Sequence, residues 1–279
     1  MSYKTLVTVV REPELDRSHL DAALAFAEAQ DAHLHILSLG IEHIPPEAFY
    51  GGTTPIAIQG TISDAIEEAT AAEAFANEQL KRSGARGEVQ RVVAQMGAVS
   101  QIVAQNAQLA DLVILSKPYG EGRSGEDVAV LEAALFSTRT PVLVLPQGKT
   151  IVPAPKRVVV AWNQSGEALA AIRAALPLMR EADSVEVLVI DPPRHSAGTA
   201  DPGAPLAEML TRHGIEVTVS VVAQTTSKVS DTITRHAADQ GADLVVMGAY
   251  GHSRLLEAVL GGATRNMLEN AALPMIVAH

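Results

Sequence analysis

The chain has 279 residues, a formal net charge of −11, a sequence pI near 5.3 and no cysteine. An acidic surface without a visible basic patch repels phosphate backbones and anionic lipid, so we expect neither nucleic acid nor a membrane as a partner. The lack of cysteine excludes disulfides, thiolate nucleophiles and thiolate metal sites, and it fits a reducing compartment. The N-terminus has no signal-peptide pattern and no apolar run could span a bilayer, so we expect a cytoplasmic protein.

The first half of the chain alternates between apolar runs and helical patterns. It opens with the β-branched run KTLVTVV, followed by the Ala-rich pattern HLDAALAFAEAQ and a second apolar run, HLHILSLG. An irregular stretch over residues 41–60 comes next, and the segment 99–116 then gives a helix, an Ala-Asp pair and a strand. TPVLVLP from Thr140 closes this half, which predicts five strands separated by four helices.

The second half repeats this order. KRVVVAW from Lys156 echoes the first run, EALAAIRAALPLM and VEVLVIDP follow it, the segment 229–248 again gives helix, Ala-Asp and strand, and LPMIVAH ends the chain. Between the halves, PQGKTIVPAPKR has three prolines and a glycine, which is typical of an extended linker. We therefore expect an N-terminal domain over residues 1–147, a linker over 148–155 and a C-terminal domain over 156–279.

The apolar runs indicate the fold class. Continuous Val/Ile/Leu runs, rather than alternating ones, indicate strands buried on both faces, which requires parallel sheets with helices above and below. The sequence thus predicts an α/β protein with two tandem doubly wound open sheets, each of about five parallel strands with helices on both faces.

The most informative loop follows the fourth predicted strand of the second half, over residues 245–268, and reads VVMGAYGHSRLLEAVLGGATRNML. In open parallel sheets, ligands bind at the carboxyl ends of the strands. Here Gly248 ends the strand. His252 or Ser253 is a possible N-cap of a short helix, which Gly261 can end. Gly262, Ala263 and Thr264 then open the next helix. The N–H groups that open the last helix predict an anion site independent of any basic side chain.

The glycine spacing alone leaves a structural role open, because glycines are common at strand and helix ends. The pattern is neither G-x-x-x-x-G-K-[ST] nor G-x-G-x-x-G, so P-loop chemistry and a dinucleotide fingerprint are unsupported. The first half builds the same pattern with other residues, since Ser116, Val128 and Ala129 stand opposite Gly248, Gly261 and Gly262. This comparison favours a ligand at the second loop, and at most one such site per chain.

Other candidates have simpler explanations. His33 and His35 share a face of a predicted strand, but satisfied or partly exposed histidines are commoner than metal ligands, and we expect no metal site. Ser165 lies in no G-x-S-x-G motif, so we expect it to cap a helix rather than act as a nucleophile. Trp162, the only tryptophan, either walls a cleft or packs against the fold.

Together these motifs resemble the universal stress protein family. The resemblance rests on the duplicated doubly wound pattern and on G-x-x-G, nine residues, then glycine and a small or hydroxyl residue after the fourth strand. The second half is the close match, through VVVAWNQSGEALAAIRAALPLM and the closing segment 245–279. The first half is similar in order and pattern only, so the chain is similar to a tandem universal stress protein.

The resemblance implies ATP or a related nucleotide at the carboxyl edge of the C-terminal domain, with Mg²⁺ as an accompanying ion. Carried over to this sequence, the nucleotide-binding residues are Trp162, Asn163, Ser165, Ile190, Met247, Gly248, Gly251, His252, Gly261, Gly262, Ala263 and Thr264. Asn163 stands where an Asp is frequent, and Gly262 stands where Ser or Thr is usual.

It also implies that the fifth strands pair, here as a pseudo-dimer within one chain, and it allows a homodimer. The implied role is a regulatory binding module of the stress response. No catalytic residue is expected, and ATP hydrolysis would be slow and incidental. The alternative is an adaptor or structural stress protein that binds no nucleotide and acts through protein–protein contacts.

Overall fold

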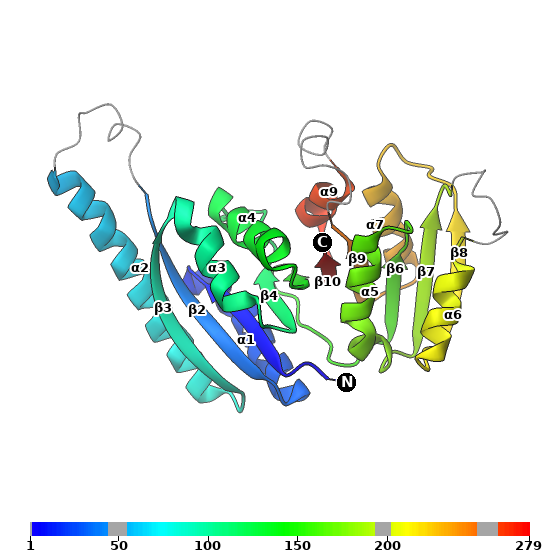
Figure 1. Cartoon of the computed structure of the whole chain (residues 1–279), viewed down its shortest axis with the longest axis horizontal. Helices are drawn as coiled ribbons and strands as arrows, with labels where there is room; N and C mark the ends of the chain where they lie inside the picture. The colour runs from blue at the N-terminus through cyan, green and yellow to red at the C-terminus, as the bar shows by residue number, and fades with distance from the viewer. Residues whose placement is uncertain (1, 44–54, 193–201, 250–261) are drawn as a thin grey trace. The chain divides into compact units, whose positions relative to one another are not determined.

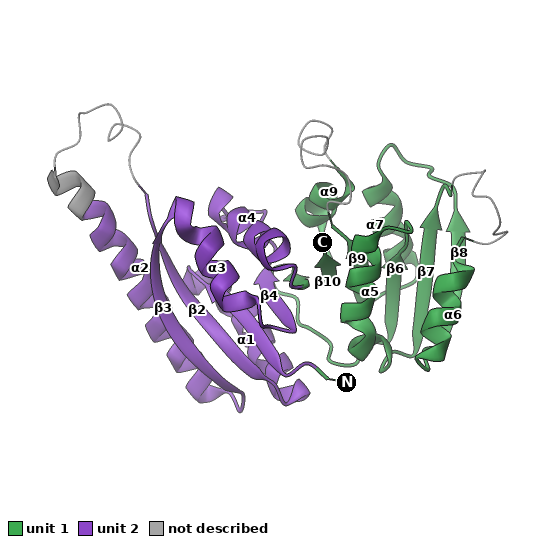
Figure 2. Ribbon diagram, viewed as in Figure 1, with its two compact units in different colours: residues 1–2, 141–279 green, residues 3–140 purple. Residues whose placement is uncertain are grey.

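The structure is a computed structural model that describes residues 2–43, 55–192, 202–249 and 262–279 (Figure 1). It divides into two compact units (Figure 2). Residues 3–140 form the first, the N-unit, and residues 1–2 with 141–279 form the second, the C-unit. This division rests on compactness, whereas the expected domain limits rest on the sequence repeat and stay a prediction.

The N-unit has strands and helices in the predicted order. Its described elements are β1 (Thr5–Val10), α1 (Pro13–Gln30), β2 (His33–Glu42), α2 (Pro55–Arg82), β3 (Arg86–Gln95), the 3-10 helix η2 (Met96–Ala98), α3 (Val99–Ala107), β4 (Leu112–Ser116), α4 (Gly125–Glu132) and the π-helical η3 (Ala133–Thr138). The strands are parallel in the order β3-β2-β1-β4. Helices α1 and α2 cover one face of this sheet, and α3 and α4 cover the other (Figure 1).

The C-unit repeats this winding. Its described elements are β5 (Val142–Leu145), β6 (Arg157–Ala161), α5 (Gly166–Met179), β7 (Ser184–Ile190), α6 (Ala204–Arg212), β8 (Val217–Val222), α7 (Val229–Asp239), β9 (Leu244–Gly248), α9 (Ala263–Asn270) and β10 (Met275–Ala278). The strand order is β5-β10-β9-β6-β7-β8. All neighbours are parallel except β5 and β10. The predicted α/β class with two doubly wound halves is confirmed.

Strand β5 ends the first sequence repeat but lies in the sheet of the C-unit. It runs antiparallel to β10, with Val144 opposite Met275, Leu143 opposite Ile276 and Val142 opposite Val277. The last strands of the two repeats therefore pair within one chain. The compact units divide at residue 140, so β5 is counted with the C-unit, although each sequence repeat has five strands.

The repeated Ala-Asp pair has a structural role in both units. Asp111 Oδ2 accepts hydrogen bonds from the backbone N–H groups of Lys4, at 2.7 Å, and Thr5, at 2.9 Å. Asp243 Oδ2 does the same for Lys156, at 2.7 Å, and Arg157, at 3.0 Å. Each Asp thus ties the start of the fourth strand of its repeat to the start of the first.

Burial follows the position of each strand in its sheet. Central strands such as β4, β9 and β10 are buried almost throughout, as continuous apolar runs predict. The edge strands β3 and β8 alternate between more and less exposed residues. In the described ranges, no helix is both long and apolar enough to span a membrane.

Candidate functional site

A cavity of about 300 Å³ opens at the carboxyl edge of the C-unit sheet. From β6, the chain adds β7 and then β8 on one side of the strand, but it places β9 and then β10 on the other side. The direction in which strands are added therefore reverses between β6 and β9. Ligands of doubly wound folds bind at such a reversal. The cavity is lined by Ala161, Trp162, Asn163, Ser165, Leu188, Ile190, Val229, Ile233, Met247, Gly248, Ala263 and Thr264.

The loop after β6 is held by its own polar groups. Asn163 Oδ1 accepts a hydrogen bond from the Ser165 backbone N–H at 3.1 Å, and Gln164 between them has a φ of 64°. Ser165 Oγ accepts from the Ala168 N–H at 3.1 Å, so Ser165 is the N-cap of α5, as predicted. The Trp162 indole N–H donates to the Pro202 carbonyl at 3.3 Å. Trp162 thus lines the cavity and is anchored to the fold at once.

Gly248, at the end of β9, lacks a Cβ for a packing reason. A Cβ placed there would lie 2.5 Å from the Ala168 nitrogen and 2.9 Å from the Glu167 carbonyl carbon, both on the first turn of α5. Gly248 is not among the described residues with positive φ. The close approach that its sequence position suggested is therefore, at least in part, an approach of the α5 backbone.

Helix α9 begins where the sequence predicted, with Gly262 as its N-cap and Ala263 as its first residue. Thr264 is buried in the first turn. Two further helices also begin at this cavity, since Ser165 caps α5 and Val229 is the first residue of α7.

Three helix N-termini therefore converge on a cavity at which none of the described lining residues carries a charged side chain. Each N-terminus has the positive end of its helix dipole and unpaired N–H groups directed beyond the helix. The cavity can accept an anionic group there, while its apolar side chains can hold a flat or apolar portion of the same ligand.

Eight of the twelve predicted site residues line this one cavity, and Gly262 directly precedes two of them. Gly251, His252 and Gly261 lie outside the described residues. Four lining residues were not predicted from the sequence: Ala161, Leu188, Val229 and Ile233. Val229 and Ile233 are spaced i, i+4 at the start of α7, and this helical spacing at the carboxyl edge was the signal that could have found them.

The matching place in the N-unit, between β1 and β4, is almost closed. Its cavity measures about 20 Å³ and is lined by Val9, Arg11, Asp16, Leu115, Ser116, Asp127 and Val130. This volume has room for about one water molecule. The two repeats thus differ sharply at equivalent positions of the fold.

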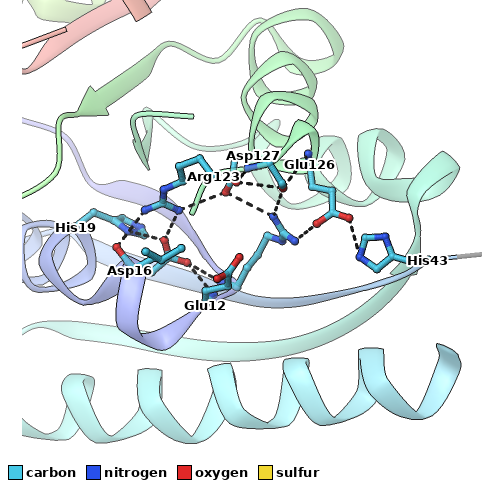
Figure 3. A network of polar contacts seen from close by, with 10 residues as sticks. Glu12, Asp16, His19, His43, Arg123, Glu126 and Asp127 are labelled. Atoms are coloured by element: carbon cyan, nitrogen blue, oxygen red, sulfur yellow. Dashed lines mark hydrogen bonds and ion pairs between the residues drawn. The ribbon is translucent and has the colours of Figure 1, made fainter. Parts of the chain in front are cut away.

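A network of charged side chains fills this place in the N-unit (Figure 3). Arg11, after β1, pairs with Glu126 and, at 3.5 Å, with Asp127, both on the first turn of α4. Arg123 pairs with Asp127 at 3.3 Å and with Asp16 at 2.7 Å. These five side chains are at most 13% exposed. The chain's own paired arginines and carboxylates thus occupy the space that a ligand would need.

Two histidines lie at the ends of this network. His43 Nε2 lies 2.9 Å from Glu126 Oε1. His19 contacts Asp16 at 3.5 Å through Nδ1 and Thr8 Oγ1 at 3.1 Å through Nε2. Thr8 uses its own hydroxyl proton on the Ile114 carbonyl, at 2.8 Å, so the His19 Nε2 donates to it. The Nδ1 of His19 thus faces the Asp16 carboxylate.

The environment of Asp16 combines opposing effects on its pKa. Burial raises the pKa, but the hydrogen bond and charge of His19, the Arg123 guanidinium and the Arg11 backbone N–H together hold the pKa of Asp16 well below its ordinary value. Asp16 Oδ2 accepts from the N–H groups of Arg11, at 2.8 Å, and Glu12, at 3.1 Å. Asp16 therefore joins the loop after β1 to α1 as an ionised carboxylate.

His33 and His35 both face Glu88 on the neighbouring strand β3. His35 Nδ1 lies 2.9 Å from Glu88 Oε1, and His33 Nε2 lies 3.8 Å from it. The hydrogen bond and charge of His35 lower the pKa of Glu88. Among the residues that the structure describes, no group of three or more His, Cys, Asp or Glu side chains could hold a metal ion.

Two doubly wound units, one of which has a cavity at the carboxyl edge of its sheet, define a two-domain α/β protein. Residues 155–279 match the model of the Universal stress protein family. The match covers the second half of the chain, and the predicted resemblance to this family is confirmed.

The fold of the whole chain has solved counterparts. A universal stress protein from Archaeoglobus fulgidus DSM 4304 is 16% identical with a TM-score of 0.71, and the match covers 98% of this chain and 95% of that one. The functionally unknown protein PA1789 from Pseudomonas aeruginosa PAO1 is 15% identical with a TM-score of 0.57, covering 99% and 92%. A universal stress protein solved in complex with cAMP is 18% identical over 45% of this chain, with a TM-score of 0.36 and 98% of that chain covered. No curated protein matches the chain.

Proposed function

We propose that this chain is a tandem universal stress protein that binds ATP or a related nucleotide in the C-unit cavity and acts as a regulatory binding module. The observation that carries this proposal is the convergence of the N-termini of α5, α7 and α9 on a cavity of about 300 Å³, whose lining among the described residues is uncharged. Although the chain has a net charge of −11, the lining residues that the structure describes include no acidic side chain, so the helix N-termini favour an anion at this place.

The two kinds of lining match the two ends of a nucleotide. Leu188, Ile190, Ile233 and Met247 offer the apolar surface that a base requires. Ala263 and Thr264, at the start of α9, offer backbone N–H groups and a hydroxyl to phosphoryl oxygens. The part of the lining that the structure describes has no carboxylate, so we expect phosphate oxygens and water to hold any Mg²⁺ bound with the nucleotide.

Asn163 contributes to this site through its amide nitrogen. Its side-chain oxygen already accepts from the Ser165 N–H within the loop. The NH₂ group is the part of Asn163 that can donate to a ribose hydroxyl. An Asp at this position would instead accept a ribose proton, so the substitution reverses the direction of that hydrogen bond.

We infer binding rather than catalysis. The described residues that line the cavity include no His, Lys, Asp or Glu, so no side chain among them can serve as general acid or base. The nucleotide would therefore act by its presence, and any hydrolysis of ATP would be slow.

Mass spectrometry of nucleotide released from the purified protein, together with calorimetric titration with ATP, tests the proposal. Ala263→Leu adds three carbon atoms at a lining position and should weaken ATP binding at least tenfold. Ala129→Leu makes the same change in α4, in the segment that the repeat places opposite α9, and should leave ATP binding unchanged. Neither released nucleotide nor heat with ATP would overturn the proposal and favour the adaptor role.

A further inference from the structure

Lys228 lies beside the cavity and holds a polar link between two of its helices. It is the N-cap residue of α7, directly before the lining residue Val229. Its ammonium donates to Asn266 Oδ1, on α9, at 2.8 Å. Asn266 in turn donates through Nδ2 to the Gly262 carbonyl, the N-cap of α9, at 3.1 Å. The cation is thus held against the first turn of the helix that begins at the cavity.

This position is electrostatically unfavourable for a lysine in the protein alone. Cations stabilise helix C-termini, whereas Lys228 lies at the amino ends of both α7 and α9. Among the described residues it forms no ion pair, and its partner is a neutral amide. An arrangement that breaks such a local rule is expected at a functional site.

The internal repeat offers a comparison. Val99 begins α3 as Val229 begins α7, so Ala98 stands opposite Lys228. The N-unit, whose equivalent cavity is closed by its own ion pairs, therefore lacks this lysine. The cation occurs only in the repeat that has the open cavity.

We propose that Lys228 contacts the phosphoryl groups of the nucleotide, exchanging its hydrogen bond to Asn266 for a charge-assisted one to a phosphate oxygen. This inference rests on the proposed function and adds a residue to it. Lys228 would then determine specificity, because it adds affinity in proportion to the phosphate charge of the ligand and makes no contact with the base. The protein should prefer ATP over AMP, and AMP over adenosine.

Calorimetric titration of the full chain with ATP, AMP and adenosine tests this role. Lys228→Met should weaken ATP binding about tenfold or more, while adenosine binding changes less than about twofold. Lys228→Arg should retain most of the ATP affinity. Lys156→Met removes the same charge before β6, at the opposite edge of the sheet, and should leave all three affinities unchanged. Thermal melts of each variant show that it is folded.

The outcomes separate the inference from the proposed function. If wild-type protein binds neither ATP nor adenosine, the proposed function fails and the role of Lys228 fails with it. If both bind and Lys228→Met lowers the affinities for ATP and adenosine equally, or not at all, the nucleotide site stands and the phosphate contact of Lys228 is wrong.

Discussion

Asp16 connects three parts of the N-unit through one carboxylate. It accepts from backbone N–H groups of the loop after β1, pairs with Arg123 and contacts His19, although its side chain is only 3% exposed. Removing one member of such a buried network leaves the remaining charges without partners, and this costs more than the net value of the pair. Asp16 is therefore the residue through which the stability of this unit depends most directly on pH.

Asp16→Asn should lower the free energy of unfolding by about 3 kcal/mol at pH 7. Because the folded pKa lies below the ordinary 3.8, the stabilisation is complete above about pH 5 and is lost as pH falls below that. At pH 3 the unfolded wild-type chain has largely bound the proton while the folded chain has not, so the difference between wild type and variant should narrow by about 1 kcal/mol. Urea unfolding at both pH values measures this.

The exposed Asp21, on the same helix, supplies the control. Asp21→Asn should change stability by less than about 0.5 kcal/mol at either pH. An equal gap between wild type and Asp16→Asn at pH 7 and pH 3 would contradict the assignment of Asp16 as the ionised centre of the network.

Gly248 illustrates the limit of prediction for a single residue. The sequence showed that a glycine ends β9 and that Ser116 replaces it in the other repeat, which favoured a ligand. A Cβ at this position would instead lie 2.5 Å from the Ala168 nitrogen, which gives the glycine a packing role against α5. Such a contact joins residues 80 apart in the chain, and no local pattern reports it. The sequence can predict that a glycine ends a strand, but it cannot predict which residue packs against that glycine in the folded protein.

Helix N-termini are the elements that build the C-unit site. Ser165 caps α5 with its hydroxyl and also lines the cavity, so one side chain serves both the helix and the site. Its two roles can be separated, because Asp is as good an N-cap as Ser but brings a negative charge.

Ser165→Asp should keep the free energy of unfolding within about 0.5 kcal/mol of wild type, because the cap is retained. It should nevertheless weaken ATP binding about tenfold, since the new carboxylate lines the cavity that the phosphates would share. Ser165→Ala should have the opposite effects: the free energy of unfolding falls by about 1 kcal/mol because the cap is lost, while the affinity for ATP changes little. Chemical unfolding and calorimetry on the same samples measure both, and tight ATP binding by Ser165→Asp would place the anion elsewhere.

The order of the elements was predictable, but not every contact between them. The repeat of apolar runs predicted five strands per half, and Gly262 predicted the start of α9, because these features depend on neighbouring residues. The contribution of α7 through Val229 and Ile233 was missed, because it depends on how one helix packs across the sheet. The Ala-Asp repeat was visible, yet the bonds of Asp111 and Asp243 to the first strands span more than 80 residues.

The molecule as a whole contains two copies of one winding that differ in what occupies the carboxyl edge. The C-unit has a cavity of about 300 Å³ with no charged side chain among its described lining residues, and the N-unit has one of about 20 Å³ lined by Arg11, Asp16 and Asp127. From the sequence, the missing glycines indicated that the first repeat lacks the motif. The missing glycines did not indicate that Arg11 would pair with a carboxylate of α4, or Arg123 with one of α1. These charged residues belong to no sequence motif that would have predicted their pairing.

One nucleotide should therefore bind per chain. A nucleotide needs a cavity of several hundred Å³, and opening the N-unit would first break buried ion pairs at a cost of about 3 kcal/mol or more for each partner removed. Calorimetric titration with ATP should give a stoichiometry of one, and Ala263→Leu should weaken that single site. Two equivalent sites, or a full-affinity site that persists in Ala263→Leu, would mean that the N-unit exchanges its internal carboxylates for phosphate. Asp16→Asn would then alter ATP binding as well as stability, whereas a closed N-unit predicts that it alters stability alone.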